Sequence, residues 1–576
     1  FYEDMANSER ALQCIHEIQR IDNRCAKAYH LHGLLLQGMG EHRNAIKEIS
    51  IGLTIESSNI ESLYLRASCY HAIGEFKEAV KDYDAALDLE LDSMEKFTIQ
   101  CMAFYQKEIA LYTASKFNSE FSWFNLDGDI DPLFKEYWFK KLHPKVVCEK
   151  VYRQPPLRDS FRKGKLKKLD FTLTKQKAAI LQAADSIGKK IQYSCSGFLP
   201  NKRQYRMAGL AAIEIAQRIV KVWRSLQNEW KGSTKGAAKN AKKIRRKEKL
   251  KSPSHNRGGA GCSTSSYSET STSLSFTEDR SYGRPSLAWE SVYSLAIKWR
   301  QISDPRDPVF WVNKLSEDCT SGFGSHTPLV LGHSKIVRFF PNFKRVFNVV
   351  KETVKENKYL HDMKDNIIYL QDSKIQEIMN AESCLDLYKA VGQEFWLATW
   401  CDTTSVDARR LEGIRISLVK AGEVGYDFSI GAPFSPSRWA DFAMEMTSSW
   451  EAICEAVCGE NFGSTDFDAL ENVREGILRM TYYWYNLMPL TRGGGMIGLI
   501  VLLGLLLACN MEFSGEIPQG VQPDWEAILN RDPNSFVSSV KTWLYPGLKM
   551  STSWKGYPDV VSTFETTASV VAALSS

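Results

Sequence analysis

The beginning of the chain repeats itself with a period of 34 residues. Gly40 returns as Gly74, and Ala45 returns as Ala79. A repeat of this length is one helix–turn–helix unit, which cannot bury its apolar face alone and must stack on its neighbours. The period therefore constrains this part of the chain to an α-solenoid, an architecture that presents surfaces for binding.

The residue pattern is typical of tetratricopeptide repeats (TPRs), in which small side chains allow two helices to cross and large ones fill the space between units. Moving back by one period places Ala11 and Ile15 at the positions of Ala45 and Ile49. We therefore expect the chain, which begins at Phe1, to be part of a longer protein with further repeats upstream. The signature positions are Tyr29, Gly33, Gly40, Ala45, Leu63, Ala67, Tyr70, Gly74, Ala79, Tyr83 and Ala86.

The first helices of these repeats are expected to line a groove that holds a partner segment. The candidate groove residues are His30, Leu34, Tyr64 and Ser68. These side chains would hold a carboxylate poorly, which disfavours the tail of a chaperone. The groove instead suits an apolar peptide or helix.

Changes in amino-acid composition along the chain indicate where its regions begin and end. Apolar residues make up 44% of the 576 residues, which is ample for sizeable cores. We predict an all-α fold in four regions, with one minor β-hairpin. These regions are a truncated TPR array over residues 1–118, a helical extension over 119–230, a disordered basic and Ser-rich linker over 231–286, and a helical C-terminal domain over 287–576.

Within the last two structured regions, helical spacing of apolar residues predicts individual elements. The expected helices cover 174–190, 204–230, 343–357, 374–400, 439–457 and 468–486. The hairpin is expected to pair residues 415–418 with 426–430 across a glycine-containing turn.

The linker contains a run of basic residues: Lys242, Lys243, Arg245, Arg246 and Lys247. Such a run is typical of a nuclear localisation signal. Attraction to phosphates or membranes and a simple solvated linker remain as alternatives. The net charge of the whole chain is only +5, so direct nucleic-acid binding is not expected.

Residues 496–509 form the most hydrophobic segment of the chain. As a helix these residues would extend about 21 Å, which is shorter than the ~30 Å hydrocarbon core of a bilayer. A buried core helix is therefore favoured over a membrane span. Membrane association, if present, is expected to be peripheral.

A glycine-rich turn precedes that segment: Arg492, Gly493, Gly494 and Gly495. Such a turn at a helix start suits an anion, and it resembles the catalytic loop of Fic-type nucleotidyl transferases. Met488 stands where that loop has its histidine, and no histidine follows His361. We therefore expect no enzyme activity, and a non-catalytic nucleotide-binding module remains as an alternative.

No cofactor or metal site is expected. The sequence has 13 cysteines, but only Cys454 and Cys458 form a close pair, and no second pair completes a zinc spacing.

Three stretches, residues 153–160, 482–490 and 521–529, together with the repeats, resemble one family closely. The chain resembles the plant TPR-containing suppressors of effector-triggered immunity, which are related to animal tetratricopeptide repeat protein 13. The resemblance would cover nearly the whole chain.

This resemblance implies a non-enzymatic adaptor that negatively regulates immune signalling and transcriptional defence responses. It implies a location in the cytoplasm, the nucleus and membrane-associated complexes. The implied partners are intracellular leucine-rich-repeat immune receptors, a lipase-like immune regulator, a co-chaperone and TCP transcription factors.

Overall fold

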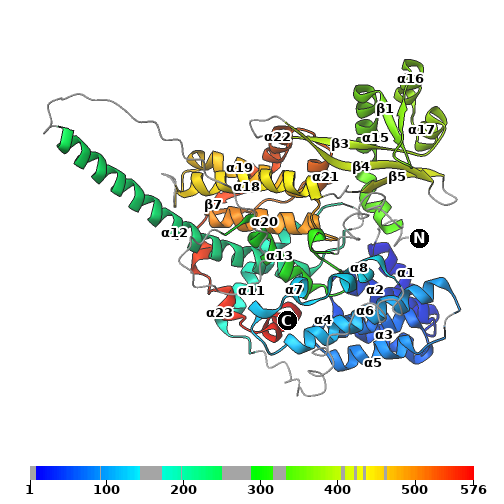
Figure 1. Cartoon of the computed structure of the whole chain (residues 1–576). Coiled ribbons are helices and arrows are strands. Elements are labelled where there is room, and N and C mark those ends of the chain that lie inside the picture. Colours follow the sequence, from blue (N-terminus) through cyan, green and yellow to red (C-terminus); the bar gives the residue numbers. More distant parts are fainter. Residues whose placement is uncertain are drawn as a thin grey trace.

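The structure is a computed structural model that describes most of the chain (Figure 1). The described residues are 8–90, 92–142, 172–195, 198–248, 287–315, 333–403, 409–420, 425–431, 436–458 and 463–576. For residues 8, 229–248, 333–341 and 436–437 only the backbone is described.

The N-terminal region is an array of paired helices, as the 34-residue period predicts. Its helices are α1 (Ser8–Ile21), α2 (Ala26–Gly38), α3 (His42–Ile55), α4 (Ile60–Ile73), α5 (Phe76–Leu87) and α6 (Met94–Lys116). Gly74 ends α4 with a φ of 85°, a conformation that favours glycine. A Cβ at Gly33 would lie 2.3 Å from Ile49, so only glycine allows α2 and α3 to approach this closely. Ala45 and Ala79 are fully buried at the helix crossings.

The helical extension follows the repeats. Its elements are η1 (Phe121–Trp123), α7 (Leu126–Asp129), α8 (Pro132–Lys140), α11 (Lys175–Gly188), η2 (Lys189–Ile191) and α12 (Lys202–Glu248). Helices α11 and α12 cross so closely that a Cβ at Gly209 would lie 1.9 Å from the carbonyl oxygen of Ala184. Helix α12 also packs on α13 (Trp289–Ser303) and α20 (Gly494–Ala508), and thus lies at the centre of the molecule.

The last part of α12 corrects the predicted linker. Residues 231–248, which we expected to be disordered, continue the helix, and Figure 1 shows this end projecting away from the body. Lysine, arginine and alanine favour helix, and extending an existing helix avoids the unfavourable nucleation step. The remaining linker residues, 249–286, lie outside the described part of the chain.

The C-terminal region contains a helical bundle and two sheets. Its other helices are η3 (Val312–Lys314), α15 (His333–Asn357), α16 (Asp372–Asn380), α17 (Cys384–Val391), α18 (Pro436–Cys458), η4 (Asp468–Leu470), α19 (Glu471–Leu487), α21 (Pro523–Ile528), α22 (Pro533–Leu544), η5 (Tyr545–Gly547), η6 (Ser553–Gly556), α23 (Val560–Thr563) and α24 (Thr567–Ser575). The helices expected at 343–357, 439–457 and 468–486 are present.

The all-α prediction holds only in part: the described residues are mostly helical, but this region also contains a five-stranded antiparallel sheet in the order β2-β1-β3-β4-β5. Its strands are β1 (Tyr359–Asp362), β2 (Ile367–Tyr369), β3 (Phe395–Asp402), β4 (Arg410–Lys420) and β5 (Tyr426–Gly431). The predicted hairpin is confirmed as β4 and β5. A smaller sheet pairs β6 (Met511–Phe513) with β7 (Leu548–Met550).

The helix expected over 374–400 is wrong, since α16, α17 and β3 replace it. The run from Phe395 to Trp400 is apolar and rich in aromatic side chains, which fits a buried strand as well as a buried helix. Gly392, with a φ of 89°, ends α17 before the strand begins.

Helix α20 is the predicted core helix. Its residues from Ile497 to Ala508 are all buried, and it packs against α12, α13 and α19. Among the described residues, no helix is long and apolar enough to cross a membrane. The apolar core is continuous from Ala45 in the repeats to Leu574 near the C-terminus, so the predicted regions share one interior.

Candidate interaction site

The predicted groove residues do not line an open groove. His30 and Ser68 are buried between helices, where the His30 Nδ1 lies 3.0 Å from Ser62 Oγ and Gln37 donates to Ser68 Oγ at 2.8 Å. Leu34 and Tyr64 are half-buried and pack against the core. Two of the side chains that we expected to hold a partner, His30 and Ser68, instead join α2 to α4.

A segment of the same chain lies against these helices. After α13 ends, residues 304–307 approach the repeats, and Gln106 of α6 donates to the carbonyl oxygen of Arg306 at 3.2 Å. Burial, together with Arg203 and Arg306, lowers the pKa of His42 to about 3. Burial also raises the pKa of Tyr64, while the nearby charge of Arg306 lowers it and that of Asp304 raises it. The segment and the repeats therefore form one buried polar interface.

An ion cluster holds this segment. Arg300 lies 3.0 Å from Asp304 and 2.7 Å from Asp307, and Arg306 lies 3.6 Å from Asp304. These cations hold the pKa of Asp304 well below its usual range, despite a burial effect in the opposite direction. Asp304 is thus charged at neutral pH, and the ion pairs of both carboxylates fix the turn after α13.

Arg203 of α12 joins three elements at the same place. Its guanidinium donates to the carbonyl oxygens of Ala72 at 2.6 Å and Ser303 at 2.8 Å, and to Ser575 Oγ at 2.9 Å. Burial lowers its pKa to about 10, so it remains a cation at neutral pH. A single side chain therefore ties α4, the end of α13 and α24 together.

The C-terminal helix covers a further part of the repeats. The N–H of Ala568 donates to the carbonyl oxygen of Phe117 at 2.8 Å, and the N–H of Phe121 donates to that of Glu565 at 2.7 Å. Helix α24 also contacts α4 directly. Helix α4 and the end of α6 are thus in contact with the C-terminal residues of the same chain.

The glycine-rich turn offers little room for a phosphate. Arg492 pairs with Asp307 at 3.4 Å. A Cβ at Gly495 would lie 2.7 Å from Asp524 Oδ2, so a buried carboxyl group already packs against the start of α20. Tyr193 donates to that carboxyl at 3.0 Å, and burial raises the pKa of Asp524. Gly493 has a φ of 77° and Gly494 accepts from Trp484 Nε1, which gives the turn a structural role.

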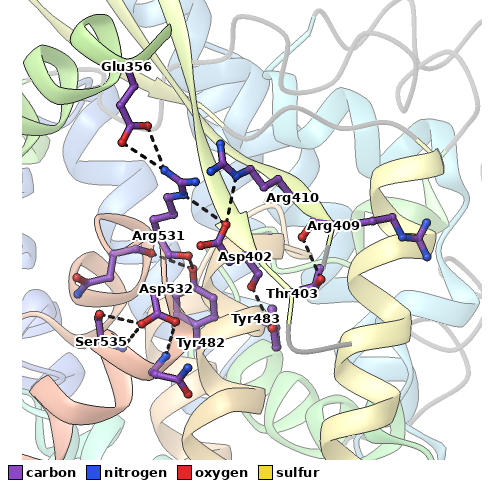
Figure 2. A network of polar contacts seen from close by, with 12 residues as sticks. Glu356, Asp402, Thr403, Arg409, Arg410, Tyr482, Tyr483, Arg531, Asp532 and Ser535 are labelled. Atoms are coloured by element: carbon purple, nitrogen blue, oxygen red, sulfur yellow. Dashed lines mark hydrogen bonds and ion pairs between the residues drawn. The ribbon is translucent and has the colours of Figure 1, made fainter. Parts of the chain in front are cut away.

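A polar network that the sequence did not suggest joins the sheet to the helical bundle (Figure 2). Arg531 lies between Glu356 of α15 at 3.0 Å and Asp402 at the end of β3 at 3.3 Å. Arg410 of β4 lies 3.5 Å from the same Asp402 carboxylate. Each acid in this group faces a cation, so the arrangement fastens two parts of the fold.

Two neighbouring tyrosines complete this network. Tyr482 donates to the carbonyl oxygen of Arg531 at 2.7 Å, and Tyr483 donates to that of Asp402 at 3.2 Å (Figure 2). Asp532 accepts from the N–H groups of Asn534 and Ser535, which start α22. The only sequence signal was the aromatic stretch 482–490, which we used for the family resemblance alone.

The basic residues 242–247 lie in the last turns of α12, and their side chains lie outside the described part of the structure. Within the described residues, no group of three or more histidine, cysteine or acidic side chains could hold a metal ion.

Comparison with known proteins supports the predicted resemblance. Residues 60–93 match the family model of the tetratricopeptide repeat. The chain is 62% identical over 529 residues to Suppressor of RPS4-RLD 1 from Arabidopsis thaliana, an alignment that covers 92% of this chain and 50% of that protein. It is 24% identical over 451 residues to human Tetratricopeptide repeat protein 13, covering 76% of this chain and 45% of that protein.

The chain spans about half the length of these curated relatives. The match to the Arabidopsis protein nevertheless extends through the repeats, the helical extension and the C-terminal region, because it covers all but a small part of the chain. The predicted resemblance is therefore confirmed: this chain is a TPR-containing homologue of the Arabidopsis suppressor over the part that aligns.

Proposed function

We propose that this chain is part of a non-enzymatic scaffold that negatively regulates plant immune signalling and transcriptional defence responses. The close similarity to an Arabidopsis protein named as a suppressor supports this function. The repeats support a role in binding proteins, because stacked helical pairs present extended surfaces. The partners we propose are those implied by the family: immune receptors, a lipase-like regulator, a co-chaperone and TCP transcription factors.

The attachment of the repeats to the C-terminal region supports a mechanism for this scaffold. Arg203 and residues 304–307 attach the repeats to the C-terminal region through buried hydrogen bonds and ion pairs. The repeats and the bundle therefore move as one body, and partners bind its outer surfaces or other parts of the longer protein. A scaffold of this kind fixes the distance and orientation between the proteins it binds.

A chimera tests the function directly. The aligned part of the Arabidopsis protein would be replaced by this chain, and suppressor activity would be measured in plants that lack the native protein. We expect the chimera to restore suppression. Ala67→Arg should abolish it, because Ala67 is fully buried in α4, whereas Met94→Arg at an exposed position should not. A folded chimera without suppressor activity would contradict the proposal.

We also propose that the scaffold acts in both cytoplasm and nucleus, with basic residues 242–247 directing nuclear import. A fluorescent fusion in which Lys242, Lys243, Arg245, Arg246 and Lys247 are changed to glutamine should lose nuclear accumulation. A matched variant would change Lys231, Lys235 and Lys239 instead and should keep it. Equal nuclear fluorescence of all three proteins would rule out this signal.

A further inference from the structure

A small pocket lies where α12, the end of α20 and η6 meet. Its volume is about 50 Å³, which is enough for a few water molecules or for one small ion. Trp223 and Leu470 form part of its apolar wall. Arg224 of α12 and Lys555 of η6 also line it, and both residues are exposed. The pocket is therefore open to solvent and carries two cations.

These two cations face no carboxylate in the pocket. None of the described residues that line it is acidic, and neither Arg224 nor Lys555 forms an ion pair with a described residue. Lys221, one turn earlier on α12, is by contrast paired with Asp559 at 2.8 Å. Burial lowers the pKa of Lys555, and the nearby charge of Arg224 lowers it further. The pocket thus concentrates positive charge that a bound anion would compensate.

A buried amide without a partner also lines the pocket. Asn510, which follows α20, is only 3% exposed. Its Oδ1 is buried and accepts no hydrogen bond, and its Nδ2 donates to none of the described residues. An unpaired buried amide is unfavourable, so a ligand oxygen that accepts from Nδ2 is stabilised here. Ser464 adds a second donor, because its Oγ accepts from the N–H of Asp466 at 3.1 Å and keeps its own proton to donate.

We propose that this pocket binds one phosphate group, as inorganic phosphate or as the phosphate of a small monoester. Such a group carries a charge between about −1.5 and −2 at neutral pH, which matches the two cations. Arg224 and Lys555 bind its oxygens through charge-assisted hydrogen bonds, and Asn510 Nδ2 and Ser464 Oγ donate to it as well. A carboxylate has one charge and two oxygens, so it would leave part of this set without a partner.

Phosphorus-31 NMR of inorganic phosphate would measure this binding to the whole chain, as line broadening that grows with protein concentration. Arg224→Gln and Lys555→Gln should each weaken binding by about tenfold or more, because each removes a charge-assisted hydrogen bond. Lys47→Gln is the matched control, since Lys47 is an exposed residue of α3 that does not line the pocket. It changes the net charge by the same amount and should bind phosphate like the wild type. Circular dichroism would verify that all three variants are folded.

A second probe, N-acetyl-O-phosphoserine amide, distinguishes the two sources of the phosphate. Binding of this probe as well would show that the pocket admits a monoester, whereas binding of inorganic phosphate alone would identify the free ion as the ligand. Either result supports the proposal if both pocket variants weaken the binding. Binding of neither probe at millimolar concentration, or equal binding to the wild type and both pocket variants, would overturn it.

Discussion

The repeats and the antiparallel sheet differ in how much of their surface contacts the rest of the chain. In the TPR array, whose inner residues were expected to bind a partner, α6 contacts residues 304–307 and α4 contacts α24 of the same chain. The sheet instead packs its central strands against helices and leaves strand β2 exposed at its edge. A recognisable binding repeat can thus serve intramolecular packing, while a surface without any motif stays open.

The first prediction separates the repeats from the bundle and has the largest expected effect. Arg203→Ala removes three bonds donated by a cation and leaves the buried carbonyl oxygens of Ala72 and Ser303 without this donor. We expect a loss of about 4 kcal/mol in the free energy of unfolding. Urea unfolding would measure the loss, and hydrogen exchange should show faster exchange in α24 and after α13.

Arg224→Ala is the matched control for this change. Arg224 lies on the same helix and is exposed, so its removal should change stability by less than about 0.5 kcal/mol. Equal effects of the two substitutions would show that Arg203 does not hold the repeats in place.

The second prediction compares the two edge strands of the sheet, β5 and β2. Phe428 of β5 is buried against Phe343 and Phe347 of α15, so Phe428→Ala should cost about 3 kcal/mol. Tyr369→Ala on the open edge should change the stability by less than about 0.5 kcal/mol. Chemical unfolding would measure both, and a large loss for Tyr369→Ala would show that the edge is covered.

The repeats were predictable because their signal is local and periodic. The spacing from Gly40 to Gly74 indicated helices α2 to α5, and the apolar run from Met496 indicated the buried helix α20. The hairpin was found for a similar reason, since strands on both sides of a glycine-containing turn are neighbours in sequence.

The cover over the repeats could not be predicted, because it comes from distant parts of the chain. Gln106 and Arg306 are 200 residues apart in the sequence. A single polar residue on a helix, such as Arg203, forms no sequence pattern from which its distant partners could be predicted. Strand β3 was missed because Phe395 and its apolar neighbours suit either a buried helix or a buried strand. Long-range pairing with β4 decides between them.

The third prediction concerns acid sensitivity of the repeats. Burial, with a smaller effect of Arg203, lowers the pKa of His71 in α4 to about 3. The unfolded state, with a histidine pKa of about 6.5, therefore binds a proton that the folded state does not bind at mildly acidic pH. Stability should fall as the pH falls below about 6.5, and His71 alone should account for about 2 kcal/mol between pH 7 and pH 5.

His71→Phe tests this assignment, because it keeps a ring beside Phe76 and removes the titrating group. Urea unfolding at both pH values should show a smaller difference for the variant than for the wild type, whatever the stability of the variant at pH 7. The same difference in both proteins would mean that other groups cause the acid sensitivity.

The smallest effect on stability is expected at the glycine-rich turn. Substitution there distinguishes an open anion-binding site from a turn with a structural role only. Arg492 is 40% exposed and pairs with Asp307, which keeps its shorter contact with Arg300. Arg492→Ala should therefore cost at most about 1 kcal/mol, since exposed ion pairs contribute little. Calorimetry with ATP should give the same result for both proteins, because the Asp524 carboxyl packs against Gly495 where a phosphate would lie. ATP binding that is lost in Arg492→Ala would reverse this assignment and make the turn an open anion-binding site.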